Sequence, residues 1–277
     1  MGWRLASKKD MPGVLEYLMR EEELCVPFTS RLRAQARGCD VFLEYGGNGV
    51  SGCMLATATG LLLPALPADG AVDRDGLGGV VRGLRAPVHS VMGVGRCVQE
   101  IEALLPVSVT TRVEYFLMTL PRDAFRPAMA PQDERVVIRK ADPADAELLF
   151  PLQKGYELEE VVIDPLHFND AQCLKLLKKT LREELVYAAE IDGRLAAKAA
   201  TNARGYAVDQ IGGVYTEPAE RGRGLAKAVV CVLLREVFSE KRAACLFVKK
   251  RNRPAISLYE RLGFRPLTDY VISYYGV

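Results

Sequence analysis

The spacing of apolar residues in the second half of the chain predicts strands that alternate with amphipathic helices. A helix is predicted to begin after Asn169, because leucines recur there every three or four residues with basic residues between them. This stripe consists of Leu174, Leu177, Leu181 and Leu185. Residues 186–190 and 195–201 indicate strands, and the Asp192-Gly193 pair between them is typical of a hairpin. From residue 135 onward the predicted order is strand, two helices, three strands, helix, strand, helix, strand.

The first half of the chain shows a fainter version of the same order, which we interpret as a degenerate second copy. Helical periodicity covers residues 11–19 and 21–37, and strand-like runs follow, among them 41–45 and 113–117. Residues 64–79 are rich in proline and glycine, which predicts a surface loop or an insertion.

Three prolines mark a boundary between the two halves. Pro121, Pro127 and Pro131 crowd a short segment that should be neither a helix nor a central strand. We therefore expect an α/β (α+β) fold with a first domain over residues 1–125 and a second over residues 132–277.

Composition is that of an ordinary globular protein. The chain has 277 residues, of which 49% are hydrophobic and 26% charged, and this length fits about two domains. No apolar run reaches the roughly 18 residues of a membrane span, and the first residues lack the layout of a secretion signal. These features predict a cytoplasmic protein without a membrane partner.

Cysteine usage and charge exclude two further classes of partner. The seven cysteines are an odd number and none forms a close pair with metal-ligand spacing, so we expect neither a metal site nor a disulfide. With 37 basic and 35 acidic residues the formal charge is +2, which is too balanced to argue for nucleic acid.

The most distinctive motif is a turn rich in glycine and arginine. A strand predicted over 208–216 is followed by Arg221-Gly222-Arg223-Gly224-Leu225-Ala226, which opens directly into an amphipathic helix. Such a turn points consecutive backbone N–H groups at one spot, where the helix N-terminus adds partial positive charge, and a pyrophosphate is favoured there. The alternative is a tight helix-entry turn that binds nothing.

Two motifs in order carry a family resemblance. Arg221-x-x-Gly224-x-Ala226 resembles the acetyl-CoA pyrophosphate loop of the GNAT acetyltransferase superfamily, and Asn252-x-x-Ala255-x-x-x-Tyr259-x-x-x-Gly263-Phe264 resembles the last helix and turn of that superfamily. The resemblance covers residues 135–277, and the first half offers only Gly93-x-Gly95, which is more typical of a tight turn.

The resemblance implies a fold of two acyl-CoA N-acyltransferase-like lobes, each a mixed, mostly antiparallel sheet flanked by helices. The C-terminal lobe would be intact and the N-terminal lobe degenerate, in a tandem arrangement similar to that of mycothiol synthase. It further implies an acetyl-CoA-dependent N-acetyltransferase in which the primary amine of a small molecule or peptide attacks directly. The residues implied to bind acetyl-CoA are Val214, Tyr215, Thr216, Arg221, Gly222, Arg223, Gly224, Leu225, Ala226 and Asn252.

Particular roles follow from the same resemblance. The pantetheine arm would pair with the end of the strand at 214–216, where the N–H of Val214 or Tyr215 would face the developing oxyanion. Tyr259 occupies the position of the general acid that protonates the leaving sulfur, although a packed aromatic is the alternative. Asn252 either contacts the cofactor or is a plain helix-capping residue.

The general base is less well defined. Several members of the superfamily carry a glutamate where this chain has Gln210, and a glutamine cannot accept the proton. Two explanations stay open: a water relay through Gln210, or a carboxylate from an acidic segment that contains Glu159 and Glu160 and that would favour a cationic amine. The same segment could simply be a solvated helix end.

The alternative function is a non-catalytic acyl-CoA sensor or regulatory module. A relative that uses aminoacyl-tRNA is disfavoured by the intact loop. Neither the acceptor amine nor the oligomeric state follows from these residues.

Overall fold

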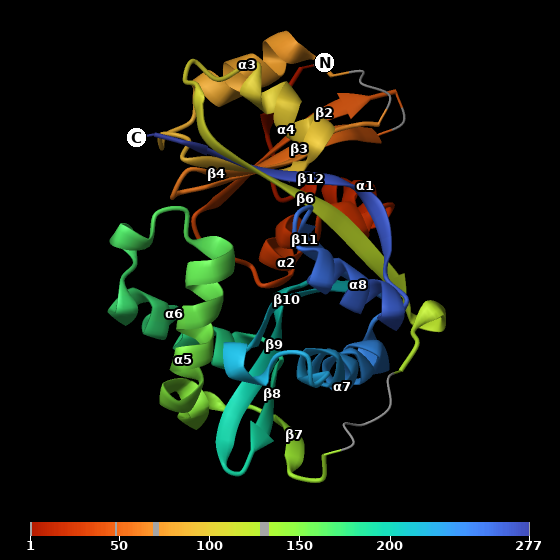
Figure 1. The fold of residues 1–277 in the computed structure, drawn as a ribbon. Helices are drawn as coiled ribbons and strands as arrows, with labels where there is room; N and C mark the ends of the chain where they lie inside the picture. The colour runs from red at the N-terminus through yellow and green to blue at the C-terminus, as the bar shows by residue number, and fades with distance from the viewer. Residues whose placement is uncertain (1, 48, 69–71, 128–132, 277) are drawn as a thin grey trace. The chain divides into compact units, whose positions relative to one another are not determined.

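The computed structural model describes residues 2–47, 49–68, 72–127 and 133–276 (Figure 1). The chain forms two compact units. Unit 1 consists of Met1–Met118, Phe247–Arg253 and Pro266–Val277, and unit 2 of Thr119–Leu246 and Pro254–Arg265. The predicted domains, 1–125 and 132–277, follow the sequence copies instead and stay a prediction, and Pro131 of the predicted boundary lies outside the described residues.

Unit 1 is built around one mixed sheet. Its elements are β1 (Arg4–Leu5), α1 (Met11–Met19), α2 (Val26–Arg33), β2 (Cys39–Gly46), β3 (Gly49–Thr57), β4 (Leu61–Ala65), α3 (Arg74–Arg82), β5 (Ser90–Val94), α4 (Gly95–Glu102), β6 (Val109–Pro121, to Met118 in this unit) and β12 (Arg265–Tyr275, from Pro266 in this unit). The strand order within unit 1 is β1-β2-β3-β4-β5-β12-β6, and β4 and β5 form its parallel pair. The last strand of the chain therefore lies between two strands of the first half.

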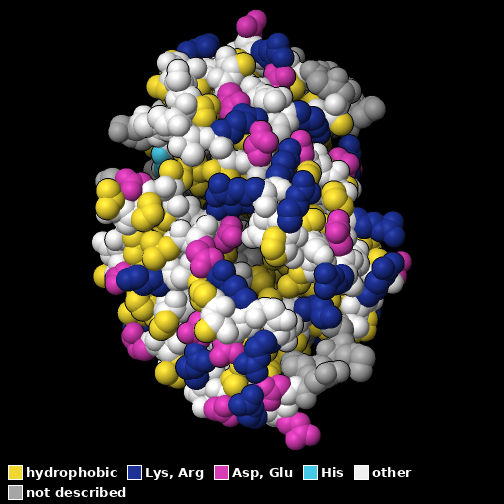
Figure 2. Space-filling model, viewed as in Figure 1, with side chains coloured by type: hydrophobic (Ala, Val, Ile, Leu, Met, Phe, Trp, Pro, Cys, Tyr) yellow, Lys and Arg dark blue, Asp and Glu magenta, His cyan; other side chains and the backbone are white. Residues whose placement is uncertain are grey.

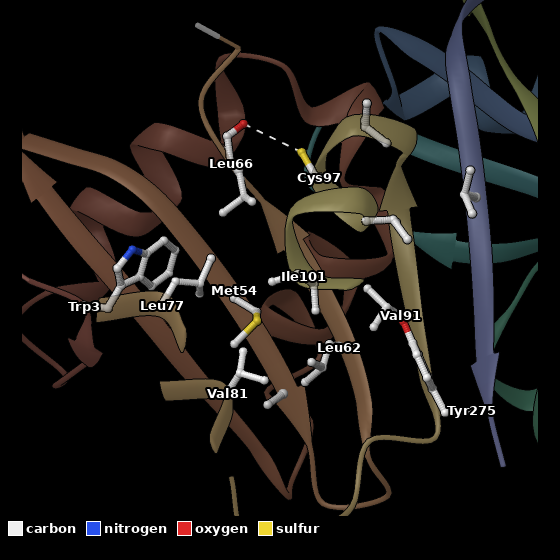
Figure 3. Close-up of a cluster of buried hydrophobic side chains, with 14 residues drawn as sticks. Trp3, Met54, Leu62, Leu66, Leu77, Val81, Val91, Cys97, Ile101 and Tyr275 are labelled. Atoms are coloured by element: carbon white, nitrogen blue, oxygen red, sulfur yellow. Dashed lines mark hydrogen bonds between the residues drawn. The ribbon is translucent and has the colours of Figure 1, made fainter. Parts of the chain in front are cut away.

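The core of unit 1 explains two differences from the predicted elements. Within the loop expected over 64–79, residues 64–65 end β4 and residues 74–79 begin the helix α3, while 69–71 lie outside the described residues. Leu77 and Val81 of α3 enter a cluster with Trp3 and Met54 (Figure 3). Burial of this apolar face outweighs the low helix propensity of the glycines in α3. The helix expected over 21–37 is a short 3₁₀ turn, Glu22–Leu24, followed by α2.

Unit 2 has the same kinds of element in the same order. They are β7 (Val136–Lys140), α5 (Ala146–Tyr156), a π-helical turn (Glu157–Val161), α6 (Asp170–Glu183), β8 (Val186–Ile191), β9 (Arg194–Arg204), β10 (Val208–Thr216), α7 (Leu225–Glu240), β11 (Ala243–Lys249, to Leu246 in this unit) and α8 (Arg253–Leu262). The order is β11-β10-β9-β8-β7, with β10 and β11 parallel. Helices α5 and α6 lie on one side of β8, β9 and β10, and α7 lies on the other (Figure 1).

An ion pair repeated in both units supports their common origin. Arg4 donates two hydrogen bonds of 2.9 and 2.7 Å to Asp10, and Arg139 donates two of 2.7 and 2.8 Å to Asp145. In each case the carboxylate stands six residues after the arginine and also accepts from the backbone N–H three residues before it. Each arginine holds the pKa of its aspartate below the usual range. The expectation of two lobes with mixed, mostly antiparallel sheets flanked by helices is confirmed.

We expect the C-terminal strand to stabilise unit 1. Val271 on β12 is 3% exposed in the core that β5 lines, so Val271→Ala should cost about 2 kcal/mol of stability. Hydrogen exchange of the β5 amides, Ser90–Val94, should speed up accordingly. The matched control is Val137→Ala on β7, where the side chain is 56% exposed and the loss should be about 0.5 kcal/mol or less. Unchanged protection of β5 in Val271→Ala would contradict this assignment.

Candidate functional site

A β-bulge interrupts the strand β10 near its C-terminal end. Gly212 is opposite Ala200 on β9 and Tyr215 is opposite Lys198, so three steps along β10 match two along β9. Gly213, inside the bulge, has a φ of +59°, a left-handed conformation that glycine adopts without strain. A side chain on Gly212 would collide with the amide of Asn202. Both glycines are therefore required by the backbone and by its neighbours.

The two neighbours of β10 cover different parts of it within unit 2. Pairing with β11 runs from Val208, opposite Ala243, to Ile211, opposite Leu246. Pairing with β9 continues to Thr216, opposite Ala197. The segment from the bulge to Thr216, which holds the predicted pantetheine-binding residues, thus lies beyond the pairing of β10 with the unit 2 part of β11.

A lysine that the sequence analysis overlooked lies buried against the bulge. Lys198 is 2% exposed, its Nζ donates a 2.8 Å hydrogen bond to the carbonyl oxygen of Gly213, and the ammonium lies 5.0 Å from the centroid of the Tyr156 ring. Burial lowers the pKa of Lys198 to about 8, an effect that the charge of Glu157 partly opposes. One signal could have identified it: a single charged residue inside the alanine-rich run of β9.

The π-helical turn after α5 places an acidic residue beside Tyr215, the residue that follows the bulge. Glu159 accepts hydrogen bonds of 2.8 Å from the Tyr215 hydroxyl and from Arg221, whose Nη2 reaches both carboxylate oxygens. The guanidinium of Arg221 also stacks over the Tyr215 ring at 5.3 Å and donates to the Thr216 carbonyl. Gly155 makes room for this contact, because a side chain there would overlap the Tyr215 hydroxyl. π-helical turns of this kind are frequent at functional sites.

The glycine-rich loop has the geometry expected of an anion site. Gly222 and Gly224 have φ values of +80° and +78°, and apart from their chain neighbours no described atom lies within 4 Å of where a β-carbon would stand on either of them. Gly224 is the N-cap of α7, a helix of 16 residues, so the first backbone N–H groups have no intrahelical partner and the helix dipole adds partial positive charge there. Leu225 is buried and anchors the first turn of the helix.

Two further groups at the site bear on ligand binding. Arg223 is held by Asp133, at 2.6 Å, and by Glu220, so its side chain orders the loop from outside. The hydroxyl oxygen of Thr216 is buried and, among the described residues, has no hydrogen-bond partner. An unpaired buried hydroxyl is costly unless a ligand completes it.

Tyr259 projects from α8 into the same region of unit 2. It is 7% exposed and its ring meets Phe264 edge-on at 5.7 Å. Burial raises the pKa of its hydroxyl, and the neighbouring Tyr156 and Glu160 raise it further. The phenol therefore stays protonated at neutral pH, as a proton donor must, while the same burial also fits the packing alternative.

Gln210 and Asn252 lie in different units. The Gln210 side chain is buried, and its Oε1 finds no hydrogen-bond partner in the described part of the chain. Asn252 lies in the Phe247–Arg253 segment of unit 1, where its backbone N–H donates to the Lys249 carbonyl at 2.8 Å. Its predicted contact with a cofactor stays a prediction.

In unit 1, side chains of the unit itself bind the end of β4 and the start of α3, which correspond to the end of β10 and the start of α7 in unit 2. The N-terminus of α3 is capped by the Asp73 carboxylate, which accepts from the Gly76 N–H at 3.0 Å. Arg96 donates to the carbonyls of Leu66 and Pro67, just after β4, at 3.2 and 2.5 Å. Gly93-x-Gly95 is not at this junction, because it spans the end of β5 and the start of α4.

Metal sites, membrane spans and charge add little to this picture. Among the described residues, no three His, Cys, Asp or Glu side chains cluster as metal ligands would, and the seven cysteines are free thiols. Within the same residues no helix combines the length and the apolarity needed to cross a bilayer. On the face in Figure 2 basic and acidic side chains are interspersed.

Comparison with known proteins connects this site to a family. Residues 191–272 match the family described as FR47-like protein. The mycothiol acetyltransferase of Acidothermus cellulolyticus is 36% identical over 80 residues, which cover 27% of this chain and 24% of that protein. The chain thus matches about a quarter of the length of this curated relative.

Solved structures align over nearly the whole chain. A Drosophila protein superposes with a TM-score of 0.72 at 16% identity, covering 98% of both chains. A tandem GNAT protein from the clavulanic acid biosynthesis pathway has a TM-score of 0.60 at 14% identity and covers 98% of this chain and 97% of its own. At such identities the likeness concerns the fold, and it confirms the predicted two-lobed acyl-CoA N-acyltransferase-like architecture.

The buried amine of Lys198 should make stability depend on pH in a defined window. The folded-state pKa is about 8 and the ordinary value 10.5, so between these values the unfolded chain holds a proton that the folded chain has released. Raising the pH through this window therefore favours folding, by up to about 1.4 kcal/mol per pH unit. In urea titrations at pH 7 to 10 the free energy of unfolding of the wild type should rise relative to that of Lys198→Met, which lacks the titrating amine. A difference between the two proteins that stays constant over this range would contradict the assignment.

Proposed function

We propose, from the premise that the chain belongs to the GNAT acetyltransferase superfamily, that unit 2 transfers an acetyl group from acetyl-CoA to a primary amine. The observation that carries this proposal is the pairing of two features in one unit. A glycine loop with open space above it stands at the N-terminus of α7, and a bulged strand end leads into that loop.

The loop residues suit the pyrophosphate of the donor. Its oxygens would accept from the N–H groups of Arg223, Gly224, Leu225 and Ala226, since α7 leaves these donors without intrahelical partners. The left-handed Gly222 and Gly224 direct the backbone toward the anion. The pantetheine arm would run along Val214–Thr216 as an added strand, where the buried Thr216 hydroxyl still needs a partner.

The chemistry requires one new bond and two proton transfers. The amine nitrogen bonds to the thioester carbon, the carbon–sulfur bond breaks, and the leaving thiolate takes a proton from the Tyr259 hydroxyl. The N–H of Val214 or Tyr215 would stabilise the negative oxygen that develops on the carbonyl. Tyr259 suits its role because burial keeps the phenol protonated at neutral pH.

The amine must also lose a proton, and Glu159 and Glu160 are the candidate acceptors. Glu159 is engaged by Arg221 and Tyr215, so we assign it to ordering the loop arginine. The charge of Glu160 raises the pKa of Tyr259, so this carboxylate acts electrostatically on the proposed general acid. We propose that Glu160 attracts a cationic amine. The proton of the amine then passes to Glu160 or to water beside Gln210.

Calorimetry with acetyl-CoA tests the donor site. Gly224→Ala should weaken binding about tenfold or more, because an alanine resists the left-handed conformation and moves the N–H groups off the anion. The matched control is Gly193→Ala in the β8–β9 hairpin, which has a φ of +80° and the same open space. Both variants should lose about 1 kcal/mol of stability, but only the first should lose affinity. Equal affinities of the two variants, or no heat with the wild type, would argue against the donor site.

The same titration gives the number of acetyl-CoA molecules bound. We expect one per chain, in unit 2, since in unit 1 Asp73 caps the start of α3 and Arg96 binds the carbonyls after β4.

Turnover against a panel of polyamines, amino acids and peptides tests the transfer itself. Tyr259→Phe should lower the rate about 10²-fold while affinity for acetyl-CoA is kept. Tyr275→Phe is the control, since it removes a buried hydroxyl of unit 1 that has no partner among the described residues. A loss below threefold in Tyr259→Phe would leave that residue a packing role. Tight binding of acetyl-CoA without transfer to any amine would favour a sensor.

A further inference from the structure

We propose that Lys198 is a positioning residue for acetyl transfer: by holding the Gly213 carbonyl, it aims the Val214 N–H at the thioester carbonyl oxygen. This inference rests on the proposed function, because it names the device that orients the oxyanion donor.

The geometry follows from the planarity of one peptide group. The carbonyl of Gly213 and the N–H of Val214 belong to the same peptide, and in a trans peptide these two groups point in opposite directions. Lys198 extends from β9 over the face of the sheet that α5 covers, and its Nζ holds the carbonyl there at 2.8 Å. The N–H of Val214 is thereby turned away from the amine of Lys198. In the proposed function this N–H faces the thioester of a pantetheine arm that runs along Val214–Thr216.

The bulge needs such a tie because the regular ladder is lost there. Between Gly212 and Tyr215 the register with β9 slips by one residue, and Gly213 is free to rotate where other residues are restricted. A hydrogen bond from a fixed amine replaces the missing ladder contact. The ring of Tyr156 covers the ammonium and keeps it in place.

Stability alone does not account for a lysine at this position. Lys198 is buried among the alanines of β9 and forms no ion pair with a carboxylate of the described residues, so an apolar side chain of similar volume would avoid the cost of burying the amine. Lys241 provides a contrast within the same unit. It is equally buried, but it donates to the Gly205 and Tyr206 carbonyls in the β9–β10 turn and lies 3.6 Å from Asp209. Its position is that of a structural lysine.

The test uses acetyl-CoA labelled with ¹³C at the thioester carbonyl and isotope-edited infrared spectroscopy on the full chain. A hydrogen bond from the Val214 N–H lowers the stretching frequency of the thioester carbonyl. This readout needs no amine substrate. Binding is first verified by calorimetry for the wild type, Lys198→Met, Lys198→Arg and the matched control Lys241→Met. We expect the low-frequency shift in the wild type and in Lys241→Met, its loss in Lys198→Met, and partial recovery in Lys198→Arg. Affinities for acetyl-CoA should agree within about threefold, and transfer to any accepted amine should fall at least about tenfold in Lys198→Met.

The outcomes separate the inference from the function on which it rests. A shift that persists in Lys198→Met overturns the inference while the donor site stands. Loss of the shift in both Lys198→Met and Lys241→Met also overturns it, because any buried lysine would then have the same effect. Failure of the wild type to bind acetyl-CoA overturns the proposed function. Should Lys198→Met not fold, Lys198→Gln takes its place under the same criteria, since its amide stops one bond short of the carbonyl.

Discussion

The extra residue in β10 is the constraint on which the arrangement of unit 2 depends. Because three steps of this strand match two steps of β9, Gly213 turns into a left-handed conformation and its carbonyl meets the amine of Lys198. The same slip sets Tyr215 beside Gly155, where its hydroxyl reaches Glu159. Glu159 in turn engages Arg221 of the glycine loop. One irregularity in a strand thereby connects the sheet, the π-helical turn after α5 and the loop at the start of α7.

Burial gives the polar groups around this bulge their chemical character. In a site with little water an amine is discouraged from holding its proton and a phenol from losing one, so the pKa of Lys198 falls and that of Tyr259 rises. Unit 1 has different contacts at the corresponding strand end and helix start. Its strands and helices follow the same order, yet Asp73 caps the helix after β4 and Arg96 binds the carbonyls that follow that strand. The two units thus share a fold, and they differ in the side chains that lie between the strand end and the start of the following helix.

Much of the fold could be predicted because it depends on near neighbours in the sequence. The predicted helix over 11–19 is α1, the Asp192-Gly193 pair joins β8 to β9, and Leu174, Leu177 and Leu181 of the leucine stripe lie on α6, which ends before Leu185. The loop predicted over 64–79 was wrong for residues 74–79, because glycines indicate a loop locally, whereas α3 is stabilised by packing Leu77 and Val81 into a distant core. The place of β12 in unit 1 was also missed, since strand pairing across the chain leaves no local pattern.

Of the candidate site, the sequence by itself determined the glycine loop, the helix that it opens and the phenol of Tyr259, because each is specified by residue types at short, fixed spacing. The tertiary structure decided which of these groups meet. Lys198 and Gly213 are 15 residues apart and Arg221 and Glu159 are 62 apart, and their contacts exist only once β9, β10 and α5 have packed together. The pKa shifts are decided at the same stage, because exclusion of water is a property of the assembled core and not of any stretch of chain.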